Sequence, residues 1–304
     1  MTKRFRHVGV LMGGTSSERE VSLRSGVSIA RGLREAGYDV DEIDLTSKDV
    51  TVADGIEAVF LALHGTFGED GGVQQILEDR RLPYTGSGPE ASQTAFDKVA
   101  TKAVFEQAGV PTPSYQEWRD GEALELPLPV VVKPPRQGSS IGLHQVVDEA
   151  KWPEASRDAL SYGDSVLVEE YIDGTELTVA MVCGEIMPIV EIRAEGGHYD
   201  FAAKYESGGT EYLVPAPLSP AIADSCSQMA VSACLEIGCR GMARVDFRLS
   251  SKKELFALEV NTLPGFTETS LLPKAADAAG IGFPELCTRI MESATTDRHE
   301  LSGR

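Results

Sequence analysis

The chain has 304 residues, of which 42% are hydrophobic and 25% are charged, the balance of a globular protein with a core shared by two or three lobes. Its formal net charge of −19 argues against duplex nucleic acid or an anionic membrane as a partner, and no apolar run approaches the roughly 18 residues of a membrane span. The five cysteines are odd in number and contain no CxxC pair, which favours reduced thiols in the cytoplasm over a disulfide framework or a zinc site.

The N-terminal part of the chain predicts alternating strands and helices. Strand patterns cover residues 7–14, 38–45 and 58–65, and helical patterns cover residues 16–37 and 72–82. The third strand is almost continuously apolar, as in a parallel sheet with both faces covered. The first apolar run is too short for a signal peptide and leads into a glycine turn, so it reads as a strand.

A lobe boundary is predicted after a third helix at residues 93–109. The proline-rich segment 110–115 that follows is typical of a link between lobes. Beyond it, strand patterns at residues 129–134 and 141–147 flank a Gly/Ser loop and indicate antiparallel sheet.

The pattern of short strands continues further along the chain. Asp173-Gly174 predicts a tight hairpin between strands at residues 165–172 and 176–182. The polar stretch at residues 193–215 has little periodicity, which predicts a binding loop or a lid.

The segment "GMARVDFRLSSKKELFALEVNT" predicts a second hairpin, whose strands end in unusual residues. A polar turn over residues 251–254 would place Asp246 opposite Glu259 and Arg244 opposite Asn261. The apolar face of this hairpin is expected to contain Ala243, Val245, Phe247, Leu249, Phe256, Leu258 and Val260. Two carboxylates opposite each other repel, so we expect a positive charge between them.

Asp246, Glu259 and Asn261 offer hard oxygen donors, which suit Mg²⁺ when phosphate oxygens complete the coordination. The alternative is a solvated outer face on which Arg244 pairs with Asp246. The presence of all four side chains at strand ends favours a site for metal and phosphate.

A phosphate-binding loop is predicted in "VVVKPPRQGSSIG", since the Walker pattern GxxxxGK[ST] is absent from the chain. Lys133 ends a strand there, and backbone N–H groups of Gly138, Ser139 and Ser140 could surround phosphate oxygens. The structural alternative is an ordinary hairpin turn.

Glu18 and His64 are expected to face one crevice, because open α/β sheets bind ligands at the carboxyl ends of their strands. Each also has a structural alternative. Thr15 and Glu18 have the spacing of a capping box, and a lone histidine often belongs to a core.

"GSGPEA", at residues 86–91, fits the dinucleotide fingerprint G-x-G-x-x-A and raises a nicotinamide-dependent oxidoreductase as an alternative. The strand before it is very short, and Pro89 lies inside the turn. This alternative leaves the Arg, Asp, Glu and Asn face of the second hairpin unexplained.

Taken in order, these segments resemble the D-alanine–D-alanine ligases of the ATP-grasp superfamily. The motifs that carry the resemblance are "LMGGTSSEREVSLRSG", "ALHGTFGEDGGVQQILE", "LPYTGSG", "FDKVATK", "VVKPPRQGSSIG", "HYDFAAKY", "GCRGMARVDF", "EVNTLPGFTETSLLP" and "AAGIGFPEL". They cover nearly the whole chain.

The resemblance implies an α/β protein with the three-lobed ATP-grasp fold. Its parts would be a parallel, Rossmann-like substrate-binding domain at residues 1–96, a central ATP-grasp lobe at 97–180 and a C-terminal catalytic lobe at 181–304. The two antiparallel α+β lobes would enclose ATP.

The resemblance also implies a reaction. The γ-phosphate of ATP goes to the carboxylate of one D-alanine, and the amine of a second D-alanine attacks the acyl phosphate, giving the dipeptide used in peptidoglycan synthesis. A pair of Mg²⁺ or Mn²⁺ ions and a homodimer are expected with it, and activation by a monovalent cation stays open.

Residue roles follow from the resemblance as well. The nucleotide ligands would be Lys98, Lys133, Ser139, Ser140, Glu169, Glu170, Tyr171, Ile172, Glu176 and Lys204. The metal ligands would be Asp246, Glu259 and Asn261. The catalytic and substrate-binding residues would be Glu18, His64, Ser139, Tyr205, Arg244, Gly265, Ser270 and Leu271.

Within the last set, Glu18 would hold the ammonium group of the first D-alanine. Arg244 and the Gly265 amide would stabilise the tetrahedral intermediate. Ser270 and Leu271 would contact the carboxylate of the second substrate, near a helix N-terminus that favours anions.

The Tyr205 hydroxyl is expected to favour D-alanine over a hydroxy acid as the acceptor. Two positions depart from the family pattern: Phe96 stands where Met is common, and Glu170 stands where Lys is frequent, which bears on nucleotide affinity. The remaining alternatives are an ATP-grasp ligase for another carboxylate and amine, and a nucleotide sensor without catalysis.

Overall fold

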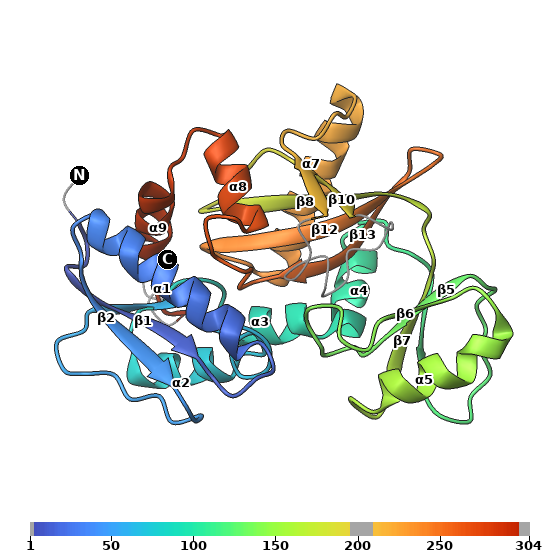
Figure 1. Ribbon diagram of the computed structural model, residues 1–304, viewed down its shortest axis with the longest axis horizontal. Coiled ribbons are helices and arrows are strands. Elements are labelled where there is room, and N and C mark those ends of the chain that lie inside the picture. The colour runs from blue at the N-terminus through green and yellow to red at the C-terminus, as the bar shows by residue number, and fades with distance from the viewer. Residues whose placement is uncertain (1–2, 195–208, 298–304) are drawn as a thin grey trace.

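The described chain, residues 3–194 and 209–297 of a computed structural model, is built around one parallel and two antiparallel sheets. The parallel sheet and the smaller antiparallel sheet lie at opposite ends of the long axis, and the larger antiparallel sheet lies between them (Figure 1). This is the three-lobed arrangement expected from the sequence.

The N-terminal lobe contains the parallel sheet, in the order β2-β1-β3. Its elements are β1 (His7–Gly13), α1 (Arg19–Glu35), β2 (Asp39–Leu45), β3 (Ala58–Leu61) and α2 (Gly72–Arg80). Helix α1 packs its buried Ile29 and Leu33 against the sheet, whose central strand is buried along almost its whole length. The strands and helices predicted for this region are confirmed.

The single helix expected over residues 93–109 is two helices, α3 (Pro89–Phe96) and α4 (Lys98–Gln107). Asp97 between them is extended, and its carboxylate accepts hydrogen bonds from the N–H groups of Val99 and Ala100. A carboxylate in this position caps α4, so the break places Lys98 in the first turn of a new helix.

The central lobe contains a four-stranded sheet in the order β4-β7-β5-β6. Its elements are β4 (Tyr115–Trp118), β5 (Val130–Lys133), β6 (His144–Val146), the short 3-10 helix η1 (Glu149–Lys151), α5 (Trp152–Leu160) and β7 (Val166–Glu170). Strand β4 begins at Tyr115, the last residue of the proline-rich segment predicted as a link, and continues beyond it. Helix α5 covers the sheet and buries Ala155 and Ala159 in its core.

The hairpin expected at Asp173-Gly174 is wrong, because β7 and β8 (Gly174–Val182) belong to different sheets. Gly174 has φ +153°, and a Cβ atom there would lie 2.0 Å from the carbonyl oxygen of Leu249. Glycine is therefore required where the chain passes from one sheet to the other and meets another backbone.

The larger antiparallel sheet runs in the order β11-β10-β8-β12-β13, with β9 paired to β8. Its further elements are β9 (Glu185–Ile186), β10 (Val190–Ala194), β11 (Thr210–Leu213), β12 (Met242–Ser250) and β13 (Leu255–Asn261). Helix α7 (Pro220–Ile237) packs against it, α8 (Leu271–Ala278) packs against β8 and α9, and α9 (Phe283–Glu292) packs against α1 and β3 of the N-terminal lobe (Figure 1). The domain boundary placed at residue 180 stays a prediction; β8 runs through that position as one strand.

The β12–β13 hairpin has the predicted register at the end of the ladder that contains Arg244 and Asn261. Arg244 pairs with Asn261 and Asp246 pairs with Glu259. A bulge after Asp246 then shifts the pairing by one residue, so that Phe247 opposes Ala257.

This bulge changes the face to which two apolar residues belong. The buried residues of β13 are Leu255, Ala257 and Val260, whereas Phe256 and Leu258 are only partly buried. Phe256 pairs with Arg248, and Leu258 lines a cavity. The apolar face expected from strict alternation is therefore wrong for Phe256 and Leu258, because a bulge breaks the period of two.

Candidate active site

Two adjoining cavities lie where the lobes meet. The Glu18 cavity, of about 340 Å³, is lined by Glu18, His64, Arg244, Asn261, Gly265, Ser270 and Leu271 among others. The Lys133 cavity, of about 320 Å³, is lined by Lys133, Ser140, Glu169, Glu170, Tyr171, Ile172, Glu176 and Asp246 among others. Both are lined by Lys98, Gln137, Gly138, Ser139 and Glu259, which form their shared wall.

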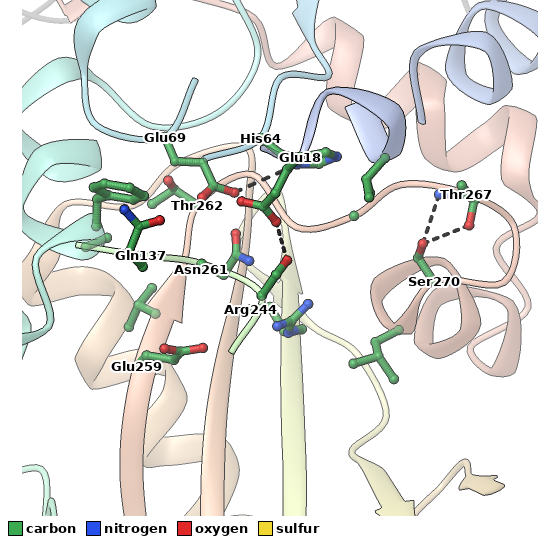
Figure 2. Close-up of a pocket in the computed structure, with 18 of the residues that line it drawn as sticks. Glu18, His64, Glu69, Gln137, Arg244, Glu259, Asn261, Thr262, Thr267 and Ser270 are labelled. Atoms are coloured by element: carbon green, nitrogen blue, oxygen red, sulfur yellow. Dashed lines mark hydrogen bonds and ion pairs between the residues drawn. The ribbon is translucent and has the colours of Figure 1, made fainter. Parts of the chain in front are cut away.

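Glu18 is 8% exposed and directs its carboxylate into the first cavity (Figure 2). The capping box expected with Thr15 does not form, since Glu18 itself is the N-cap of α1 and makes no side-chain capping bond. Its carboxylate accepts a hydrogen bond from the Ser139 hydroxyl instead. A Cβ atom on Gly65 or Gly138 would lie 2.9 Å from Glu18 Oε2, so both glycines let the loops close around this carboxylate.

His64 holds the loop that carries Gly265. Its Nδ1 lies 3.0 Å from the carbonyl oxygen of Leu263, and its Nε2 lies 3.1 Å from the Ser25 hydroxyl. The same hydroxyl accepts a hydrogen bond of 3.1 Å from the N–H of Phe266. Both ring nitrogens are thus engaged with the protein, and the loop is fixed on either side of Gly265.

Arg244 and Asp246 form an ion pair with two parallel contacts. Nε of Arg244 lies 2.8 Å from Oδ1 of Asp246, and Nη2 lies 2.8 Å from Oδ2. The Thr178 hydroxyl donates a further bond of 2.6 Å to Oδ1. The pairing that was the structural alternative is therefore present, and it also orients Arg244 at the wall of the Glu18 cavity.

Glu259 has a cationic partner of its own. The ammonium of Lys98 lies 3.3 Å from Oε2 of Glu259 and donates a bond of 2.8 Å to the carbonyl oxygen of Gln137. Lys98 thereby connects the β12–β13 hairpin to the Gly/Ser loop. The repulsion expected between the paired carboxylates is offset by Lys98 on one and Arg244 on the other.

The donor set at the hairpin end suits a hard divalent cation. Asp246 and Glu259 face each other across the ladder, and the amide oxygen of Asn261, which accepts a 3.0 Å bond from Leu263, lies beyond them. Within residues 3–194 and 209–297, no group of three or more His, Cys, Asp or Glu side chains is arranged to hold a metal ion. A cation at this position would therefore need the amide and ligand oxygens as well.

The Lys133 cavity contains a buried charge cluster. The ammonium of Lys133 lies 2.5 Å from Oε2 of Glu169, whose Oε1 lies 2.7 Å from the ammonium of Lys102. Burial opposes the charge on Lys133, but Glu169, Glu259 and Asp246 outweigh it and raise the pKa of this ammonium. Burial likewise opposes the charge on Glu169, but the two lysines lower the pKa of its carboxyl.

The segment expected to contact adenine, residues 169–172, begins in the last two residues of strand β7 and continues beyond it. The Glu169 side chain points to the two lysines, Glu170 is exposed, and Tyr171 and Ile172 line the cavity. Further along, Oε2 of Glu176 lies 3.3 Å from Nη2 of Arg248 across the β8–β12 ladder, and both residues line the same cavity.

The Gly/Ser loop contributes strained backbone to the shared wall. Ser139 and Ser140 have φ values of +52° and +58°, in the left-handed region that costs a non-glycine residue about 1–3 kcal/mol. Strain of this kind is typical of ligand sites. The N–H of Ile141 also donates a 3.1 Å bond to the carbonyl oxygen of Gly138, so Ser139 and Ser140 are the central residues of a turn with the positive φ values of a type I′ hairpin turn. The hairpin turn that was the structural alternative is therefore present, and the phosphate-binding loop stays a prediction.

Ser270 stands at the N-terminus of α8, at the far end of the Glu18 cavity (Figure 2). Its hydroxyl accepts a 3.0 Å bond from the N–H of Thr267 and lies 2.9 Å from the Thr267 hydroxyl. The hydroxyl therefore fixes the loop instead of capping α8. Unpaired N–H groups in the first turn of a helix favour an anion.

All predicted site residues within the described chain line one of the two cavities, whereas Lys204 and Tyr205 lie outside the described residues. Sequence reasoning missed Ser25 and Lys102. Lys102 follows Lys98 by four residues, so its place on the same face of α4 was available as a signal. Ser25 offered no signal, because a serine within an amphipathic helix is unremarkable.

The comparisons with known proteins agree with this geometry. The family model described as D-ala D-ala ligase C-terminus matches residues 98–292, and the model described as D-ala D-ala ligase N-terminus matches residues 46–87. No helix in the described part of the chain is both long and apolar enough to cross a membrane.

Relatives match over almost their whole length. The D-alanine–D-alanine ligase of Syntrophotalea carbinolica is 47% identical over 95% of this chain and 96% of its own. That of Desulforudis audaxviator is 46% identical over 95% of this chain and 98% of its own. A crystal structure of the Bacillus anthracis ligase complexed with ATP superposes with a TM-score of 0.84 at 32% identity, over 95% of this chain and 97% of that one.

Proposed function

The chain belongs to the D-alanine–D-alanine ligase family, and from this premise we propose how its residues divide the reaction between the two cavities. It is an ATP-dependent ligase that joins two D-alanines to give D-alanyl-D-alanine for peptidoglycan synthesis. The observation that carries the division of labour is the shared wall of Lys98, Gln137, Gly138, Ser139 and Glu259.

The Lys133 cavity is the proposed ATP site. It is lined by Lys133 and Lys98, whose ammonium groups suit phosphate oxygens, and by apolar Ile172 and Leu258, which suit a purine. Glu176 is placed to bind a ribose hydroxyl. Lys204 is proposed as a further nucleotide ligand from the family resemblance alone.

The Glu18 cavity is the proposed site of the two D-alanines. Glu18 is negatively charged, nearly buried and adjacent to the shared wall, so it suits the ammonium group of the first substrate. The N-terminus of α8, with Ser270 and Leu271, suits the carboxylate of the second. The first substrate's carboxylate would then face the phosphates of ATP.

Asp246, Glu259 and Asn261 are proposed to hold Mg²⁺ or Mn²⁺, which when bound offsets negative charge on the transferred phosphoryl group. Arg244 is held by Asp246 at the wall of the Glu18 cavity, where its guanidinium suits the oxyanion of the tetrahedral intermediate. The N–H of Gly265 suits the same oxyanion, because the loop is fixed on both sides of it.

Two properties are proposed beyond the reaction itself. A cytoplasmic location is supported by the use of ATP and by the five cysteines, all of which are free thiols. A homodimer is proposed from the family resemblance, and light scattering on the purified protein would test it.

The nicotinamide alternative gains no support from the geometry. The "GSGPEA" segment begins α3, and only an isolated bridge at Tyr84, not a strand, precedes it. A dinucleotide fingerprint needs a full strand before its turn.

The test of the proposed function is the release of inorganic phosphate from ATP with D-alanine, with L-alanine and with neither. We expect release with D-alanine only, in step with dipeptide formation. Release that is the same in all three samples, or equal with both enantiomers, would contradict it and favour a ligase for other substrates.

A further inference from the structure

The buried charge cluster of Lys102, Glu169 and Lys133 contains one residue with no place in the proposed reaction. The side chain of Lys102 is 0% exposed, that of Glu169 is 3% exposed and that of Lys133 is 8% exposed. Lys133 and Glu169 line the ATP cavity, but Lys102 lies behind Glu169 and lines neither cavity. Removing an ammonium group from water costs free energy, so a fully buried lysine needs a compensating interaction or a function.

Lys102 is also connected to strand β13, through Thr112. Its ammonium donates a bond of 2.6 Å to the Thr112 hydroxyl, which donates in turn a bond of 2.8 Å to the carbonyl oxygen of Ala257 in β13. Since the Thr112 proton goes to that carbonyl, Lys102 must be the donor to Thr112. Lys102 therefore has a fixed position between Glu169 and the catalytic hairpin.

The charges of the cluster do not cancel. Burial lowers the pKa of the Lys102 ammonium, whereas Glu169 acts to raise it. With both lysines charged, two ammonium groups flank a single carboxylate and leave one positive charge on the side of the cavity, where Lys133 lies. If Lys102 were neutral, Glu169 would pair with Lys133 alone, and the pair would present no net charge to a nucleotide. In a poorly solvated site this difference is large, because Coulomb interactions are weakly screened there.

We propose that Lys102 is a positioning residue for ATP: it neutralises Glu169, so that the charge of Lys133 is available to the nucleotide phosphates. This inference rests on the proposed assignment of the Lys133 cavity to ATP. Lys102 acts through Glu169 and touches neither the nucleotide nor the reacting atoms.

The test is calorimetric binding of ATP, ADP and adenosine to the full chain and three variants. Lys102→Met should bind ATP and ADP roughly ten- to a hundredfold more weakly, because the net positive charge facing the phosphates is lost. Adenosine should bind it as it binds wild type. The double variant Lys102→Met with Glu169→Gln removes one charge of each sign, restores the excess of one, and should recover most of the ATP affinity.

Thr112→Val is the matched control. It removes the hydrogen bond behind Lys102 but leaves all three charges, so ATP affinity should change less than threefold. Thermal unfolding of each variant checks that a loss of binding is not a loss of fold, and the double variant, which buries no unbalanced carboxylate, keeps the test available if Lys102→Met unfolds.

Two results would overturn the inference: ATP binding by Lys102→Met at wild-type affinity, or a double variant that binds no better than the single one. Both differ from failure of the proposed function, in which wild type itself would not bind ATP in this cavity. Lys133→Ala reports on that separately, since it should weaken ATP binding whether or not Lys102 has a role.

Discussion

The carboxylates of the site are each oriented by a partner beside the cavity. Ser139 donates to Glu18, Arg244 pairs with Asp246, and Lys98 lies next to Glu259. Ser139 and Lys98 come from other segments of the chain and Arg244 comes from the same strand as Asp246, and together they direct the carboxylate oxygens before substrates arrive. Orientation of this kind lowers the reorganisation needed during the reaction.

Glu259→Gln should nearly abolish turnover and leave the fold intact. The amide keeps the shape of the side chain but removes the charge that faces Lys98 and the proposed metal position. Because repulsion from Asp246 is also removed, the melting temperature should stay the same or rise slightly. Activity measured against Mg²⁺ concentration checks this, and near-normal activity at sub-millimolar Mg²⁺ would contradict the metal assignment.

Ser25→Ala should lower kcat by about five- to thirtyfold, the equivalent of one lost hydrogen bond of about 1–2 kcal/mol, because the loop around Gly265 loses the bond from the N–H of Phe266 to the Ser25 hydroxyl. Ser22→Ala is a matched control on the same helix. Ser22 is equally buried, but its hydroxyl joins Gly13 to Ala62, away from the Gly265 loop. Equal losses of kcat in both variants would show that the effect is general destabilisation.

At the scale of elements, the sequence predicted strands and helices best where a period was unbroken. The N-terminal strands and α1 follow from their apolar patterns, and the pairing of Asp246 with Glu259 follows from a polar turn of known length. The bulge after Asp246 could not be read from the sequence, because no residue type marks it. It sends Leu258 to the Lys133 cavity instead of the core.

The Asp173-Gly174 pair misled for a similar reason. A turn dipeptide indicates that the chain bends, but it does not show whether the next strand joins the same sheet. The residues that line the two cavities were named more completely than the sheet pairings, because the family resemblance implies them residue by residue. The sequence analysis did not identify Lys102 and Ser25, because their contacts with Glu169 and Phe266 form only in the folded chain.

Gly174→Ala should lower the free energy of unfolding by about 3 kcal/mol or more, because its Cβ would press against the backbone of β12. Gly163→Ala is the matched control: a Cβ atom there meets nothing within 4 Å, so stability should be unchanged or slightly higher. Urea unfolding of both variants measures the difference. A Gly174→Ala variant as stable as wild type would show that the strands separate easily at this crossing.

At the scale of the whole molecule, the two ends of the described chain share one core. Helix α9 packs against α1 and against β3 of the parallel sheet, and the carboxylate of Glu292 accepts hydrogen bonds from the hydroxyl of Tyr38 and the N–H of Arg4. The N-terminal lobe is therefore completed by the last helices of the chain. The catalytic hairpin lies between the segments that meet in this way, so the site is assembled only when the entire chain has folded.

The shared wall is expected to couple the binding free energies of ligands in the two cavities. A ligand that orders Ser139 or Glu259 from one side alters the surface met by a ligand on the other side, so their binding free energies are coupled. Linkage then requires that D-alanine change the affinity for ATP by the same factor as ATP changes the affinity for D-alanine. Titrations of each ligand with and without a non-hydrolysable partner should give equal factors above one, and Ser139→Ala should bring both toward one together. A factor of one in wild type would mean that the wall does not transmit binding between the two cavities.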